Sequence, residues 1–205
     1  MQKQDSKAEL YFEWWCKELK EAGYIHEFVD HGYLFPLTPQ YQIPVKKELV
    51  NSVKEIHRTL LQPGTYTPDF TIEWDSSAVG VFIQELFSIT LPMPIFTFQW
   101  YEGKMLSHID VKPSYTKRQS DRTVFSWLQK FTFMEYKIFV SPLVFETLFK
   151  KTFTPKRYDY TDASFEPRYN KKTGKRLKDL PPRQRKRKWV HRSLKQFIKE
   201  KNDGS

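Results

Sequence analysis

The chain has 205 residues and a formal net charge of +10. Hydrophobic residues make up 39% of it and aromatic residues 17%, which is enough apolar material for a folded core and excludes disorder throughout. No apolar run approaches the roughly 18–20 residues of a membrane helix, and the single cysteine, Cys16, excludes an internal disulfide. The first ten residues are polar, so we expect a cytoplasmic protein with no membrane partner.

The positive charge is concentrated towards the end of the chain. Residues 165–205 hold 15 Lys and Arg against four acids, a net charge of +11, so the other 164 residues hold 19 bases and 20 acids, a net charge of −1. A neutral body with a cationic extension predicts a polyanionic partner, most simply nucleic acid. A solubilising tail is the alternative. We therefore expect one domain over residues 1–160 and a basic tail over residues 161–205.

The first third of the chain contains two helix-like patterns. Residues 6–23 predict a helix with Ser6 as its N-cap and a buried stripe at helical spacing. Residues 24–43 look extended and contain prolines. From residue 45 to residue 61, apolar side chains recur at i, i+4, i+8, i+11 and i+15, which predicts a second, amphipathic helix.

Strand-like sequence dominates the middle of the chain. We predict strands over residues 66–74, 79–91, 95–101 and 105–112. The tripeptide at residues 102–104, Glu-Gly-Lys, is typical of a tight hairpin between the last two. We interpret residues 75–108 as strands inserted between two halves of the domain.

The remaining elements alternate between helix and strand. A helix capped by Ser120 or Asp121 is expected to run to residue 135, followed by a short strand at 136–140 and by a short helix or irregular segment at 143–151. After residue 155 the sequence reads as an exposed basic linker. Helical spacing returns over residues 186–201, so the tail is expected to end in an amphipathic helix.

Two short strings suggest chemistry: Pro68-Asp69 opens one predicted strand, and Asp110-Val111-Lys112 ends another. Because side chains alternate along a strand, Asp110 and Lys112 should share one face about 6.5–7 Å apart while Val111 points into the core. Pairing of the two strands would bring Asp69 beside them. Two carboxylates, helped by the Val111 carbonyl, suit Mg²⁺, and the ammonium suits phosphodiester hydrolysis.

This pattern resembles the PD-(D/E)XK nuclease superfamily, and its order resembles small phage-borne endonucleases and resolvase-like members. The resemblance covers about residues 6–140. It implies an α/β, restriction-endonuclease-like core in which helices flank a central mixed sheet. It also implies that Glu9, Asp69 and Asp110 are the metal carboxylates and that Lys112 is the catalytic lysine. Mg²⁺ is the expected cofactor, and Mn²⁺ its substitute.

The substrate implied is DNA, duplex or branched, in the cytoplasm of the host cell if a phage encodes the protein. A homodimer is also implied, since a small chain must cut two strands. The residues expected to contact nucleic acid are basic and lie after the lysine motif or in the tail: Lys117, Arg118, Arg183, Arg185, Lys186, Arg187 and Lys188. The alternative is a non-catalytic nucleic-acid-binding or nucleoprotein-assembly protein, and a third is an enzyme acting on RNA.

Several of these residues have purely structural alternatives. Glu9 has the spacing to complete a capping box with Ser6. His108 could flank the site, although a surface position is expected. Trp189 could stack on bases or pack on the body. Three further acids are reserve ligands: Glu13, Glu73 and Glu85.

Overall fold

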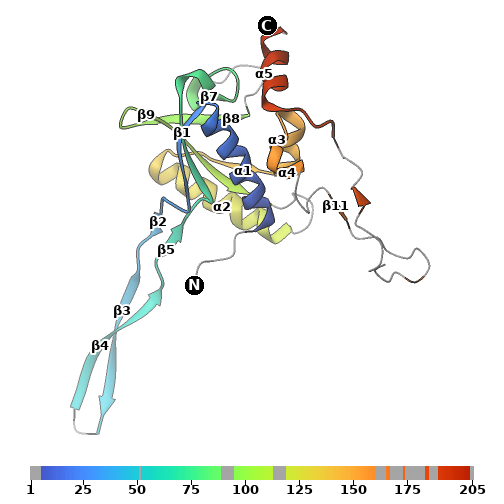
Figure 1. Ribbon diagram of the computed structural model, residues 1–205. Coiled ribbons are helices and arrows are strands. Elements are labelled where there is room, and N and C mark those ends of the chain that lie inside the picture. Colours follow the sequence, from blue (N-terminus) through green and yellow to red (C-terminus); the bar gives the residue numbers. More distant parts are fainter. Residues whose placement is uncertain are drawn as a thin grey trace.

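A computed structural model gives the structure of the chain. It describes residues 6–50, 52–88, 95–112, 119–159, 165–166, 173, 183–184 and 189–203. The fold is α/β, with a mixed central sheet flanked by helices, as the sequence predicts (Figure 1). Within the described part of the chain, no helix is long and apolar enough to cross a membrane.

The central sheet is built around β9, which is buried from Met105 to Val111. The strands lie in the order β1 (Ile25–Asp30), β6 (Phe70–Trp74), β9 (Lys104–Val111), β8 (Phe96–Tyr101) and β7 (Ile83–Glu85), with β10 (Val140–Leu143) also beside β9. The first half of β9 pairs with β8 and its second half with β10, while β6 occupies its other side. The pairs β9–β10 and β7–β8 are parallel and the others antiparallel.

Helix α1 (Lys7–Glu21) covers one face of this sheet. The helix forms as predicted, because Ser6 caps its first turn and a stripe of large apolar side chains points inward. Phe12 packs edge-on against Phe70, with ring centroids 5.0 Å apart, and Trp15 packs against Trp74. The aromatic rings of α1 thus bury much of one sheet face.

Helix α2 (Gln119–Tyr136) lies against a second, smaller core. Phe125 from this helix packs with Phe35, Tyr66 and Val140. The helix agrees with the prediction over residues 120–135. It continues to Tyr136, which explains why β10 begins four residues later than the strand predicted from residue 136.

The helix predicted over residues 45–61 is wrong. The segment is an antiparallel hairpin of β3 (Tyr41–Leu49) and β4 (Ser52–Leu61), and it projects from the body on a base of β2 (Phe35–Thr38) and β5 (Gly64–Tyr66) (Figure 1). The β-branched residues favour strands, and Val45 lies directly opposite Ile56. A helix here would also lack a surface on which to bury its apolar face.

The sheet edge near β7 is less regular than predicted. Residues 79–91 contain only the three-residue strand β7, between the 3-10 helices η1 (Ser76–Ala78) and η2 (Leu86–Ser88). The β8–β9 hairpin is confirmed. Glu102 and Gly103 both have positive φ, as the two central residues of a type I′ turn require. The short helix or irregular segment predicted over residues 143–151 is the helix α3 (Phe145–Lys151).

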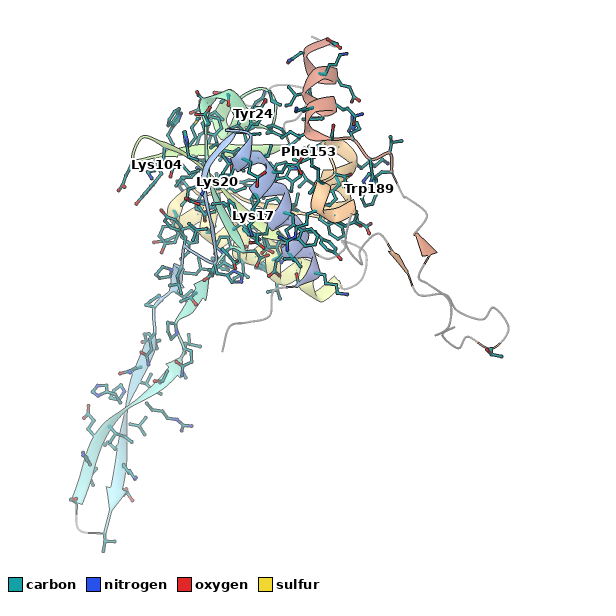
Figure 2. The ribbon with its side chains drawn as sticks, in the orientation of Figure 1. Lys17, Lys20, Tyr24, Lys104, Phe153 and Trp189 are labelled. Atoms are coloured by element: carbon teal, nitrogen blue, oxygen red, sulfur yellow. The ribbon has the colours of Figure 1, made fainter. Side chains whose placement is uncertain are left out.

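The described end of the tail returns to the body. Helix α4 (Lys156–Asp159) precedes the tail, whose described elements are the pair β11 (Phe165–Glu166) and β12 (Arg183–Gln184), and α5 (Leu194–Asp203). Trp189 donates a hydrogen bond from Nε1 to Thr154 Oγ1 at 3.0 Å and lies near α3 and α5 (Figure 2), so it packs on the body. Phe197 of α5 is buried against Phe82. Helix α5 begins eight residues later than the predicted residue 186.

Candidate active site

The two acidic strings meet where β6 begins and β9 ends. Phe70 of β6 lies opposite Ile109 of β9, so the next position in the same register places Asp69 opposite Asp110. The Val111 backbone N–H donates to Asp69 Oδ2 at 2.6 Å. The predicted juxtaposition of the two carboxylates is therefore what the strand pairing produces, with Asp69 held beside the end of β9.

Lys112 lies on the same side of the chain as Asp110. Its Nζ forms an ion pair with Asp110 Oδ1 and sits over the Phe125 ring, 4.9 Å from the centroid. The side chain of Val111, between them, is buried in the main core, as strand alternation predicts. The Val111 N–H contacts the site through its hydrogen bond to Asp69. A metal-binding role for the Val111 carbonyl stays a prediction.

Tyr66 is a site residue that the sequence reasoning missed. Its hydroxyl donates to Asp110 Oδ2 at 2.7 Å, so both oxygens of Asp110 have partners. Burial and the adjacent carboxylates of Asp110 and Asp69 raise the pKa of the Tyr66 hydroxyl well above its usual range, which keeps it a donor. Tyr66 stands three residues before Asp69, but only the tertiary structure shows that it reaches Asp110.

The site carries excess negative charge. Burial, followed by the charge of Asp110, raises the pKa of Asp69 to about 7, and the Glu9 charge acts in the same direction. The Val111 N–H and the Lys112 ammonium act against this rise. Asp69 thus experiences the charges of two other carboxylates against one ammonium, and a further cation would relieve this repulsion.

Glu9 occupies the structural role that its spacing allows. Ser6 Oγ donates to Glu9 Oε1 at 2.7 Å, and the Glu9 N–H donates to Ser6 Oγ, so the capping box is confirmed. Among the described residues, no set of three or more His, Cys, Asp and Glu side chains is close enough to hold a metal ion. Glu9 therefore influences Asp69 through its charge, without joining it and Asp110 in one ligand cluster.

The residues present still fit a magnesium ion. Mg²⁺ prefers hard oxygen ligands, keeps several waters, and is usually held by one or two carboxylates. Asp69 and Asp110 provide two, and of the described residues none donates to Asp69 Oδ1. Burial and the neighbouring Asp110 charge both disfavour the ionised form of Asp69, and a divalent cation bound between the two carboxylates would offset that cost.

The reserve ligands are engaged elsewhere. Glu13 pairs with Lys17, Glu73 pairs with Lys104 at 2.7 Å, and Glu85 accepts from Ser88.

The expectation that His108 lies at the surface is wrong. It is buried, bonded through Nδ1 to Thr71 Oγ1 at 3.0 Å, and burial lowers the pKa of its imidazole to about 4. The rings of Phe35 and Tyr33 cover it edge-on, so it supports the base of the projecting hairpin.

Most of the basic residues expected to bind nucleic acid lie outside the described residues: Lys117, Arg118, Arg185, Lys186, Arg187 and Lys188. Arg183 is described only as part of β12, and its side chain is not. Their roles stay predictions.

Comparison of the chain with protein-family models, with curated proteins and with solved structures gives no match. The functional argument therefore depends on the geometry around Asp69, Asp110 and Lys112. That geometry holds two acids and a lysine at one end of the central strands, with a tyrosine fixing the shared acid. Such a group can bind a divalent cation and place an ammonium beside a bound phosphate.

Proposed function

We propose that the protein is a metal-dependent endonuclease that hydrolyses DNA phosphodiester bonds. The observation that carries the proposal is the cross-strand placement of Asp69 opposite Asp110, with Lys112 paired to the second acid. Two like charges directly opposite each other on paired strands destabilise a sheet. Such pairs are typical of functional sites, where a bound cation or a reaction uses the charges.

The three side chains take distinct roles in this proposal. Asp69 and Asp110 hold Mg²⁺, which when bound supplies electrostatic stabilisation to the scissile phosphate. Lys112 positions the attacking water or offsets charge that develops on the phosphorus. Tyr66 is a positioning residue, because its hydroxyl orients the Asp110 carboxylate.

The order of elements supports the restriction-endonuclease-like core that the resemblance implies. Helix α1 precedes β6, which begins just after Asp69. After β7 and β8 comes β9, which ends just before Lys112, and α2 then leads to β10, parallel to β9. The assignment to the PD-(D/E)XK superfamily is part of the proposal.

The proposed nuclease is a homodimer that pairs through α2. Exposed apolar residues on this helix follow the 3-4-3 spacing of a two-helix interface: Val124, Trp127, Phe131 and Met134. Lys130 and Glu135 flank this stripe. In a parallel pair each Lys130 would lie beside Glu135 of the partner subunit, so the stripe and its charges are self-complementary.

Incubation with supercoiled plasmid tests the activity. We expect nicked or linear products with Mg²⁺ or Mn²⁺ and none with EDTA. The variants Asp110→Asn and Lys112→Met should each lower the cutting rate by at least roughly 100-fold, as loss of one electrostatic catalytic group does. Linear, branched and RNA substrates, compared in the same assay, identify the preferred nucleic acid.

A matched pair on the same strands provides the control. Glu73 and Lys104 also join β6 to β9 by an ion pair, at the opposite end of the strands. Glu73→Gln and Lys104→Met should therefore cut at wild-type rates. Equal cutting by the site variants and the control variants would reject this site, and a plasmid that is bound but never cut would favour the non-catalytic alternative.

A further inference from the structure

The hairpin of β3 and β4, called the ribbon below, is exposed over most of its length, and of its described side chains only Ile43, Val45 and Thr59 are half-buried. Its strands have 9 and 10 residues, which corresponds to about 30 Å at the usual rise of a strand. Figure 2 shows its side chains pointing to solvent, away from the body. A two-stranded ribbon that buries so little is marginally stable by itself. Its persistence as a projecting element therefore calls for a partner.

The pairing register divides the ribbon into two faces. Residues directly opposite each other in an antiparallel pair share a face, and successive pairs alternate between faces. The face called the basic face contains Ile43 opposite Arg58, Val45 opposite Ile56, and Lys47 opposite Lys54. The opposite face contains Gln42, Pro44, Lys46, Glu48, Val53, Glu55, His57 and Thr59.

Charge is segregated between these faces. The basic face has three cations, Lys47, Lys54 and Arg58, and no acid, a net charge of +3. The opposite face has one Lys against two Glu, a net charge of −1, and there Lys46 lies directly across from Glu55. Lys47 faces Lys54 instead, and like charges directly opposite destabilise a ribbon. A polyanion on the basic face would remove that cost.

The base of the ribbon is tied to the proposed active site. Gly64 lies so close to Thr38 that an added Cβ would stand 2.6 Å from the Thr38 hydroxyl oxygen, and that hydroxyl accepts the Gly64 N–H at 2.9 Å. The last pair of this base, Phe35 with Tyr66, contains the residue whose hydroxyl holds Asp110. Tyr136 of α2 also donates its hydroxyl to the carbonyl of Pro36. The ribbon is thus fixed to both the sheet and α2.

We propose that the basic face of the ribbon docks in the major groove of duplex DNA and positions the duplex over Asp69 and Asp110. This rests on the proposed function and adds the substrate's shape to it. The major groove is about 12 Å wide and admits a two-stranded ribbon, whereas the minor groove is only about 6 Å wide. Lys47, Lys54 and Arg58 contact phosphates, and these contacts set orientation without reading sequence.

Binding of a labelled duplex of ~30 bp by the full chain tests the proposal, with EDTA present so that no strand is cut. The variant Lys47→Gln/Lys54→Gln removes two cations from the basic face. The slope of log K against log salt should fall by about 1.8, at about 0.9 per phosphate contact, which corresponds to roughly 30-fold weaker binding at 0.15 M salt. A major-groove ligand, methyl green, should compete with the protein, and the minor-groove ligand netropsin should not.

Two controls separate position from charge. Lys46→Gln changes the neighbouring residue on the opposite face, and Lys17→Gln/Lys20→Gln removes two charges from α1, where Figure 2 labels both lysines. Both should bind nearly as wild type. Wild-type affinity in the Lys47→Gln/Lys54→Gln variant, or equal losses in the controls, would overturn the ribbon proposal.

The remaining outcomes distinguish the two proposals. Duplex binding that depends on the ribbon, without cutting in Mg²⁺, leaves the ribbon proposal standing and rejects the nuclease. If the Lys47→Gln/Lys54→Gln variant cuts DNA at the wild-type rate, the nuclease proposal stands and the ribbon proposal is rejected. Sedimentation equilibrium without DNA is the last measurement: association of copies that the Lys47→Gln/Lys54→Gln variant abolishes would make a second copy the ribbon's occupant and overturn the DNA assignment.

Discussion

Asp69 and Asp110 lie opposite each other at the point where β6 and β9 separate, and the carboxylate of the first accepts the N–H of the residue after the second. This N–H anchors Asp69 beside an acid that repels it. Burial, followed by the Asp110 charge, raises the pKa of Asp69, and Lys112 pairs with Asp110 on the same side.

The first prediction concerns Asp69 without divalent ions. Its pKa in the folded protein, about 7, lies above its ordinary value, so the folded state holds the proton more tightly than the unfolded state. Its contribution to stability is present below about pH 4 and is lost as the pH rises through 7. Asp69→Asn keeps an acceptor for the Val111 N–H and should raise the free energy of unfolding at pH 8 by about 1–2 kcal/mol, after discounting for solvent screening.

Urea unfolding at pH 4 and pH 8 measures this difference, and the gain should almost vanish at pH 4. Asp75→Asn is the control, because it should change the stability at pH 8 in the opposite direction. Asp75 caps η1, and the Ser77 hydrogen bonds lower the pKa of its carboxyl, so its variant should lose stability at pH 8. A gain at pH 4 as large as that at pH 8 would mean that Asp69 is not under charge repulsion.

The second prediction concerns divalent ions. Because Asp69 must lose its proton to bind a cation, Mg²⁺ should raise the melting temperature more at pH 8 than at pH 6. At 100 times its dissociation constant the ion would stabilise the folded protein by ~2.7 kcal/mol. Asp110→Asn should abolish the shift and Glu73→Gln should keep it. A shift that is the same in both variants would place the ion elsewhere.

Local patterns in the sequence sufficed for part of this structure. A capping box and an aromatic stripe specify α1, and Glu102-Gly103 specifies the β8–β9 hairpin, because both depend on neighbours in the chain. Strand alternation places Asp110 and Lys112 together for the same reason. These features needed no knowledge of tertiary packing.

Features that depend on distant contacts were missed. The apolar residues of segment 45–61 fit a helix by spacing, but pairing of Val45 with Ile56 decides in favour of the ribbon. Tyr66 and His108 acquire their roles only when β5 and β2 close over the sheet, bringing a hydroxyl to Asp110 and two rings to the imidazole. Spacing along one strand carries no information about such contacts.

The third prediction concerns Tyr66. Tyr66→Phe keeps the ring in the small core with Phe35 and Phe125 but removes the hydrogen bond to Asp110. Loss of a hydrogen bond to a charged group should cost about 1.5–3 kcal/mol of stability. Cutting should slow by roughly tenfold while duplex affinity is unchanged, because a loosened Asp110 mispositions Lys112 rather than the DNA. Unchanged cutting by a folded Tyr66→Phe protein would remove Tyr66 from the site.

The fourth prediction concerns His108. Its pKa in the folded protein, about 4, lies below its ordinary value near 6.5, so the unfolded state takes up a proton first as the pH falls. The contribution of the neutral imidazole to the free energy of unfolding, about 3 kcal/mol, is fully present above pH 6.5. It is lost as the pH falls from 6.5 to 4. His108→Gln should flatten this part of the stability profile measured by urea unfolding. Replacement of the exposed His57 should leave the profile unchanged; a steep profile in the His108 variant would contradict the assignment.

The fifth prediction concerns the α2 interface. If two copies pair in parallel along the stripe of Val124, Trp127, Phe131 and Met134, Lys130→Glu should repel Glu135 of the partner subunit and weaken the dimer. The double variant Lys130→Glu/Glu135→Lys restores opposite charges across the interface and should recover the dimer. The two residues are five apart on one helix and so do not face each other within a subunit, which makes recovery diagnostic of pairing between copies. Sedimentation equilibrium of the three proteins decides the matter, and a monomeric wild type would leave the apolar stripe to another partner.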